Sequence, residues 1–111
     1  MNPEACISLA AEACGVTPAD VTSRFRFRPM VKARHLACWL MRRGLGMKLD
    51  IIAILVGRKD HSLAYHAIWR MEERRERDAE FKALSDGLLA VVSADKNMHN
   101  AKILNEIRAE I

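Results

Sequence analysis

The chain has few of the residues that staple or interrupt small domains. Among its 111 residues are three cysteines, five glycines and three prolines. An odd cysteine count is poor material for a disulfide framework, so we expect reduced, mostly buried thiols. No apolar run of about 18 residues occurs, and residues 1–4 lack the basic and apolar parts of a signal peptide. These absences predict a cytoplasmic protein without a membrane span.

Sequence signatures of catalysis and nucleotide binding are also missing. No Gly-x-x-x-x-Gly-Lys-Ser/Thr, His-Glu-x-x-His or Gly-x-Ser-x-Gly motif occurs. Asp60, His61 and Ser62 are consecutive, so their side chains fan apart and cannot form a triad. His35 and Cys38 share a helical face, but no second Cys or His pair lies nearby to complete a metal site. We therefore predict no enzyme, no cofactor, no small-molecule substrate and no metal centre.

The charge of the chain is distributed unevenly. A chain of 12.6 kDa that is 50% apolar and 29% charged is one domain with a core of its own. The net charge is only +4, yet residues 23–75 hold 13 Lys or Arg against 4 Asp or Glu, and the remainder holds 5 against 10. A basic middle between acidic ends is typical of a polyanion-binding face, and ordinary solvated helix charge is the alternative.

Helix start and stop signals punctuate the first part of the chain. Asn-Pro at residues 2–3 predicts a helix that Gly15 ends, and Thr-Pro at residues 17–18 predicts a short helix that ends near Ser23. The irregular, arginine-rich stretch that follows, residues 24–28, reads as a basic loop. No strand pattern occurs, so the predicted fold class is all-α.

The middle of the chain carries a helix-turn-helix pattern. A helix with one apolar face is expected over residues 31–43, ended by Gly44 and Gly46, and a short apolar helix over residues 48–56. Gly57-Arg58-Lys59 forms a tight turn, and Asp60 is an N-cap candidate for a longer helix. Two helices joined by a short turn with glycine, the second polar at its start, are typical of the helix-turn-helix motif.

Further helices are predicted at the C-terminal end. A helix capped by Asp78 is expected to place four side chains inward: Phe81, Leu84, Leu88 and Val91. Residues 95–97 read as a hinge. An apolar stripe on the last segment predicts a homodimer contact or a protein partner, with packing on the chain's own domain as the alternative: Ile103, Leu104, Ile107 and Ile111. We assign residues 1–93 to the helix-turn-helix domain and 94–111 to a C-terminal amphipathic helix.

Several aromatic and imidazole side chains are predicted to be structural. Trp39 and Trp69 lie on helical apolar stripes, and His66 lies almost opposite His61 around its helix, so these side chains are expected inside. His35 and Cys38 are interpreted as core residues. Two phenylalanines between the loop arginines are expected to anchor the loop to the body of the domain, with stacking on bases as the alternative: Phe25 and Phe27.

The turn and the start of the next helix, residues 57–67, read Gly-Arg-Lys-Asp-His-Ser-Leu-Ala-Tyr-His-Ala. This stretch resembles a signature of the C-terminal DNA-binding domain of the bacterial replication initiator DnaA, which reads Gly-Gly-Arg-Asp-His-Thr-Thr-Val-x-His-Ala. Residues 24–28 and Lys-Ala-Arg-His-Leu-Ala at 32–37 match the basic loop and the next helix opening of that family. The resemblance covers about residues 5–90, and the spacing between loop and Asp-His motif is kept without a gap. It implies a Trp-repressor-like helix-turn-helix fold, here as a stand-alone protein with additional C-terminal helices.

The resemblance also implies roles for individual residues. The family reads an asymmetric duplex box with the recognition helix in the major groove and the basic loop in the minor groove. Carried over by position, Arg26 is the minor-groove residue, and the base contacts in the major groove come from Asp60, His61, Ser62 and Tyr65. Phosphate contacts are expected from eight cations: Arg24, Arg28, Lys32, Arg34, Arg42, Lys48, Arg58 and Lys59.

Among the departures from the family pattern, four bear on the expected DNA contacts. Asp50 replaces a proline near the DNA and brings a negative charge toward phosphates, while Leu63 replaces a threonine and loses its hydroxyl. Tyr65 replaces a leucine that meets a thymine methyl, and Arg58 replaces a glycine, which makes the turn more basic. These departures concern the sequence of the box more than the ability to bind DNA.

The leading functional hypothesis is sequence-specific binding to double-stranded DNA at DnaA-box-like sites. The protein is then a nucleoid-associated regulator of replication or transcription without ATPase activity, of a kind that suits phages and prophages. One alternative is a phage-type packaging or regulatory oligomer with weakly specific DNA binding. The other is a protein-interaction module that targets a replication protein.

Overall fold

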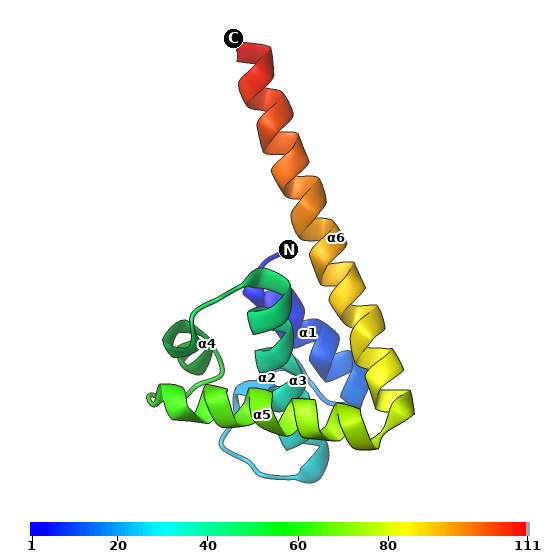
Figure 1. Ribbon diagram of the computed structural model, residues 1–111. Helices are drawn as coiled ribbons and strands as arrows, with labels where there is room; N and C mark the ends of the chain where they lie inside the picture. Colours follow the sequence, from blue (N-terminus) through cyan, green and yellow to red (C-terminus); the bar gives the residue numbers. More distant parts are fainter. Residues whose placement is uncertain (111) are drawn as a thin grey trace.

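The computed structural model describes the backbone of residues 1–110 and the side chains of residues 1–94 (Figure 1). Six helices and no strand occur in this part of the chain, which confirms the all-α prediction. Their bounds are α1 Pro3–Cys14, α2 Pro18–Thr22, α3 Arg28–Leu45, α4 Leu49–Leu55, α5 His61–Arg77 and α6 Ala79–Glu110.

The predicted helix starts in the first part of the chain are confirmed by their caps. Asn2 Oδ1 accepts from the backbone N–H of Ala5 at 2.8 Å, and α1 ends at Gly15, whose φ of 71° is left-handed. Before α2, Thr17 and Asp20 each accept from the other's backbone N–H, at 3.2 and 2.9 Å, in a capping box. These contacts are local, so the neighbouring residues alone determine where both helices begin.

Helix α3 is the centre of the domain and packs against α1, α5 and α6. It is longer than predicted because Pro29 in its first turn starts the helix within the arginine-rich stretch, at residue 28. Gly44 does not end it. A Cβ atom at that position would lie 2.5 Å from Cγ1 of Val92, so glycine here allows α6 to pack closely on α3, and the helix ends at Gly46 with a φ of 66°. Among the described residues, the buried apolar core consists of Cys6, Ile7, Ala10, Ala11, Val21, Ala33, Leu36, Ala37, Cys38, Trp39, Leu40, Met41, Ile52, Ala53, Val56, Ala64, Ala67, Met71, Phe81 and Val92.

Helix α6 begins as predicted but presents a different face. Asp78 Oδ1 accepts from the backbone N–H of Phe81 at 3.0 Å. Leu84 and Val91 are exposed, whereas Ser85 and Val92 are fully buried, so the predicted inward stripe is wrong by one position at these two places. The apolar pattern is ambiguous because a leucine or valine directly precedes each of these buried positions, Leu84 before Ser85 and Val91 before Val92.

The predicted hinge at residues 95–97 is also wrong, because α6 is a continuous helix from Ala79 to Glu110. Figure 1 shows that the second half of α6 runs beyond the other five helices. The side chains of the predicted interaction stripe lie outside the described residues: Ile103, Leu104, Ile107 and Ile111.

The imidazole of His35 in α3 is partly enclosed by the fold. Nδ1 of His35 is buried and has no hydrogen-bond partner within the described part of the chain. Burial lowers the pKa of this imidazole to about 4, and Arg74, Arg34 and Arg70 add to the shift because their charges oppose a second cation. His35 is therefore neutral in the folded protein at neutral pH, in keeping with the predicted core role.

We expect His35 to lower the stability of the fold as the pH falls from about 6.5 to about 4. The pKa is depressed on folding, so the unfolded chain binds the proton first, and in this window unfolding is favoured as protons are added. The loss is on the order of 2–3 kcal/mol. Urea denaturation of the protein and of His35→Phe at pH 7 and pH 4.5 measures it. The prediction is wrong if both proteins lose the same free energy of unfolding over this range.

Candidate nucleic-acid interface

The turn between α4 and α5 is closed by backbone geometry that requires glycine. Gly57 has a φ of 79°, and the N–H of Arg58 donates to the carbonyl of Ala53 at 2.8 Å, which terminates α4. A Cβ atom on residue 57 would lie 2.7 Å from the carbonyl oxygen of Thr22. The turn therefore packs directly against the end of α2, and the start of α5 has a fixed position relative to the basic loop that follows α2.

A buried arginine holds the beginning of that loop. Arg34 is 5% exposed, and its Nε donates to the carbonyl of Val21 at 2.7 Å. Its Nη2 donates to three further carbonyls, of Ser23 at 2.8 Å, Phe25 at 3.1 Å and Asp20 at 3.3 Å. The phosphate contact predicted for Arg34 is thus corrected, because this guanidinium is buried in the domain and its Nε and Nη2 groups donate to backbone carbonyls.

The same Ser23 carbonyl joins the loop to the turn. Nη2 of Arg58 donates to it at 3.1 Å, and Nη1 of Arg58 donates to the carbonyl of Gly57 at 3.3 Å. The residue that replaces the family's glycine is therefore half-buried and bonded to the protein itself. One carbonyl, accepting from Arg34 and Arg58, links the basic loop to the helix-turn-helix turn.

The first turn of α5 presents polar side chains to solvent. Asp60 is the N-cap, as predicted, and its Oδ1 accepts from the backbone N–H of Ser62 at 2.9 Å. This hydrogen bond lowers the pKa of the Asp60 carboxyl, so the group is a carboxylate at neutral pH. The side chains of Asp60 and His61 are both largely exposed, and Ser62 is half-buried. Acceptor and donor groups are thus gathered at one helix start.

The outer face of α5 is more exposed than predicted. Tyr65, Trp69 and His66 all lie at the surface, so the prediction that Trp69 and His66 are packed inside is wrong, whereas Trp39 is buried as predicted. The indole of Trp39 lies in the core of the domain, and its Nε1 donates to Glu72 at 2.8 Å. Only Ala64, Ala67 and Met71 of α5 are fully buried, because small residues bring α5 close to α3 and leave no room for a second large ring.

The basic loop projects its side chains into solvent. Arg24, Arg26 and Arg28 are exposed, as their predicted roles require. Phe25 and Phe27 are 63% and 65% exposed and stack on each other, with ring centroids 6.2 Å apart. They do not anchor the loop to the body, which corrects the prediction. Arg34 anchors it through backbone carbonyls, so the two rings are free for other contacts.

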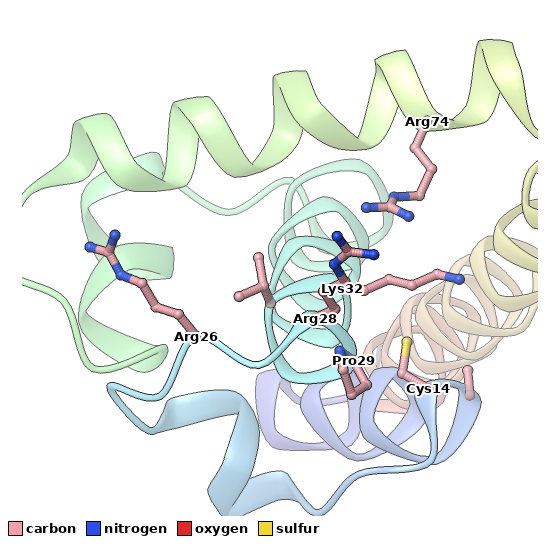
Figure 2. A pocket seen from close by; sticks show the side chains of 8 residues that line it. Cys14, Arg26, Arg28, Pro29, Lys32 and Arg74 are labelled. Atoms are coloured by element: carbon pink, nitrogen blue, oxygen red, sulfur yellow. The ribbon is translucent and has the colours of Figure 1, made fainter.

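The remaining predicted phosphate contacts lie at three places. Arg42 and Lys48 are exposed and line one shallow depression with Asp50 and His61, beside the start of α5. Lys59 is exposed in the turn. Lys32 is half-buried in α3 and lines a cavity of about 700 Å³ together with Arg26 and Arg28 (Figure 2).

That cavity has a fourth cation that the sequence did not single out. Arg74, near the end of α5, reaches the same space from the opposite side, as Figure 2 shows. It is separated from Lys32 by 42 positions in the chain. Residue spacing alone gives no signal for such a pair, because only the packing of α5 over α3 brings the two side chains together.

The described residues show neither a metal-binding cluster nor a membrane-spanning helix. No group of three or more His, Cys, Asp or Glu side chains there is placed to hold a metal ion. Over the same residues, no helix combines the length and the apolar character that a membrane span needs. The three cysteines are free thiols, and burial raises the pKa of Cys6 to about 11.

Comparison with known proteins identifies the domain that carries these features. A family model described as bacterial DnaA protein helix-turn-helix matches residues 3–70. The chain belongs to this DnaA helix-turn-helix family. The match runs from the start of α1 into α5 and contains every residue predicted to contact bases or phosphates, whereas Arg74 and α6 lie beyond it.

Similar curated proteins carry the description "Chromosomal replication initiator protein DnaA". The chain is 32% identical over 95 residues to the DnaA of Gloeobacter violaceus, covering 86% of the chain and 22% of that protein. It is 33% identical over 90 residues to the DnaA of Aquifex aeolicus, covering 81% and 22%. To the DnaA of Aliarcobacter butzleri it is 30% identical over 82 residues, covering 74% and 19%. The chain thus spans about a fifth of the length of these DnaA proteins.

Proposed function

We propose that this protein binds double-stranded DNA sequence-specifically at DnaA-box-like sites and regulates replication or transcription there. The observation that carries the proposal is the Ser23 carbonyl, which ties the basic loop and the start of α5 together. The basic loop and the start of α5 are held in one arrangement, which suits simultaneous binding in two adjacent grooves of one duplex. Membership of the DnaA helix-turn-helix family supports DNA as the ligand.

In this binding mode the first turn of α5 enters the major groove. The Asp60 carboxylate accepts from a cytosine amino group, while Ser62 serves either as donor or as acceptor. His61 and Tyr65 are exposed on the same helix end and reach base edges beside them. Asp60 keeps its bond to Ser62, so the carboxylate that reads a base is also held in place by the helix it caps.

The basic loop enters the neighbouring minor groove through Arg26. A narrow minor groove has an enhanced negative potential that attracts an arginine side chain. Phosphates on either side are contacted by exposed or half-exposed cations, which add affinity without sequence information: Arg24, Arg28, Lys32, Arg42, Lys48 and Lys59. Arg34 and Arg58 instead support the loop and the turn from within.

Fluorescence anisotropy with two duplexes tests the proposal. One duplex carries a DnaA box and the other a scrambled box of equal length and composition, both at physiological salt. We expect the box to be preferred about 1,000-fold or more. Arg26→Ala and His61→Ala are each expected to reduce that preference by about ten- to a hundredfold. Arg77→Ala, which removes an exposed cation at the far end of α5, is the matched control and is expected to leave the preference unchanged.

The other outcomes separate the alternatives. Tight but equal binding to both duplexes would contradict specific reading and favour an oligomer of the packaging type. Absence of binding to either duplex, with the fold verified by circular dichroism, would contradict DNA as the ligand and favour a protein-interaction module.

A further inference from the structure

The cavity of about 700 Å³ beside the basic loop is lined by cations from three parts of the fold. Arg26 and Arg28 come from the loop and the start of α3, Lys32 from the next turn of α3, and Arg74 from α5. In Figure 2 the guanidinium groups of Arg28 and Arg74 point toward each other, and Lys32 extends to one side of them, above Cys14. No carboxylate lines it. The cavity is therefore built for a negatively charged occupant.

These cations have no acidic partner among the side chains that the structure describes. Over the residues whose side chains are described, none of the four forms an ion pair with a carboxylate, although Arg70 and Arg75 on the same helix as Arg74 both do. Nζ of Lys32 and Cζ of Arg74 instead lie 4.6 and 5.7 Å from the ring centroid of Phe81, which is buried. Two like charges thus lie within cation–π distance of one aromatic ring, and an anion between them would offset their mutual repulsion.

The thiol of Cys14, at the edge of the cavity, lies within the electrostatic influence of Lys32 and Arg74. Burial raises the pKa of Cys14, while Lys32 and Arg74 act in the opposite direction because their positive charges favour the thiolate. Both cations therefore act at one point of the cavity wall.

We propose that this cavity binds a phosphoryl group, and that the group is a backbone phosphate of the DNA that flanks the box on its minor-groove side. The inference rests on the proposed function. Guanidinium groups match phosphate oxygens in a bidentate way, and two of them converge here with an ammonium group. Arg26 belongs to both the cavity and the minor-groove element, so a strand leaving that groove passes the cavity. Arg74 extends the footprint beyond the part of the chain that matches the family.

The experiment compares Arg74→Gln with Arg77→Gln on two duplexes. Arg77 is an exposed cation three residues further along α5 and outside the cavity, so both variants lose one charge from the same helix. Both duplexes carry the box, but one ends at its edges and the other continues for about one helical turn on each side. We expect Arg74→Gln to weaken binding of the longer duplex about three- to tenfold and to lower the salt slope by about one, with no effect on the shorter duplex.

A second arm distinguishes flanking DNA from a free phosphate ligand. Inorganic tripolyphosphate is added to the wild-type protein and both variants, and the melting temperature is followed by circular dichroism, which also shows that each variant folds. Stabilisation that Arg74→Gln loses and Arg77→Gln keeps supports the phosphoryl site even if no duplex binds, so this arm stands apart from the proposed function. Equal behaviour of the two variants in both arms would overturn the inference. An effect of Arg74→Gln with tripolyphosphate but not with flanking DNA would overturn the assignment to the duplex.

Discussion

Replacing Arg34 with alanine is expected to lower the free energy of unfolding by about 3 kcal/mol, because the change removes a charged donor from four carbonyl groups. The carbonyls of Ser23 and Asp20 keep their other bonds, from Arg58 and from Ser23, whereas those of Val21 and Phe25 lose the side-chain donor that Arg34 supplies. Hydrogen bonds from a charged group contribute about 1.5–3 kcal/mol each, but water reaches part of the vacated space and offsets some of the loss. Urea denaturation followed by circular dichroism measures the change. We expect DNA affinity to fall as well, because the start of the basic loop loses its support.

Two further variants test whether the geometry of Arg34 matters beyond its charge. Arg34→Lys keeps the charge but not the planar fork that spans several carbonyls, so we expect it to recover less than half of the loss. Arg28→Ala removes an exposed arginine from the start of the same helix and is expected to change stability by no more than about 0.5 kcal/mol. Equal losses for Arg34→Ala and Arg28→Ala would show that the buried network contributes nothing.

Replacing Gly57 with alanine is expected to cost about 2–4 kcal/mol through two separate effects. The left-handed φ of 79° strains any residue with a Cβ atom by about 1–2 kcal/mol. The new Cβ would also lie 2.7 Å from the Thr22 carbonyl oxygen, and because that atom is backbone, the turn must move away from α2. Urea denaturation gives the loss of stability, and duplex titration gives the accompanying loss of box preference.

Gly15 supplies a matched control for this substitution. Its φ of 71° is similar, but a Cβ there would meet nothing within 4 Å. Gly15→Ala should therefore show the backbone strain alone, with DNA binding unchanged. If the two variants lose equal stability, the contact between the turn and α2 is of no consequence and the prediction for Gly57 is wrong.

The parts of the fold that the sequence predicted correctly are those that depend on neighbours in the chain. The caps at Asn2, Thr17, Asp60 and Asp78 are all occupied as expected, because a cap is a contact over two or three residues. The helix-turn-helix pattern was legible for the same reason, since the left-handed glycine of the turn lies between two recognisable helices. The family resemblance then gave the residues at the start of α5 their predicted roles, which stay predictions.

The errors concern side chains whose surroundings are set by distant segments. In the sequence, nothing distinguishes Arg34 from the other cations of its helix. It is buried because the end of α2 and the residues after it pack over its side chain and accept its hydrogen bonds. Trp69 follows an apolar spacing and His66 lies almost opposite His61, yet both are exposed, because α5 packs on the domain through Ala64, Ala67 and Met71. Arg74 lies in a stretch of consecutive charged residues, 72–77, in which no single cation stands out. Its neighbours across the cavity lie more than 40 positions earlier in the chain.

The carbonyl of Ser23, shared by Arg34 and Arg58, has a consequence for the DNA. The shared carbonyl couples the loop to the turn before α5, so in the proposed mode we expect their two contacts to keep one helical phase along the duplex. A base pair inserted between the minor-groove and major-groove parts of a site rotates one part by about a tenth of a turn relative to the other. The protein cannot follow that rotation at little cost, so the duplex must twist or bend instead, at a cost that depends on its sequence. In the proposed mode, the number of base pairs between the minor-groove and major-groove parts of the site is therefore recognised along with the bases themselves.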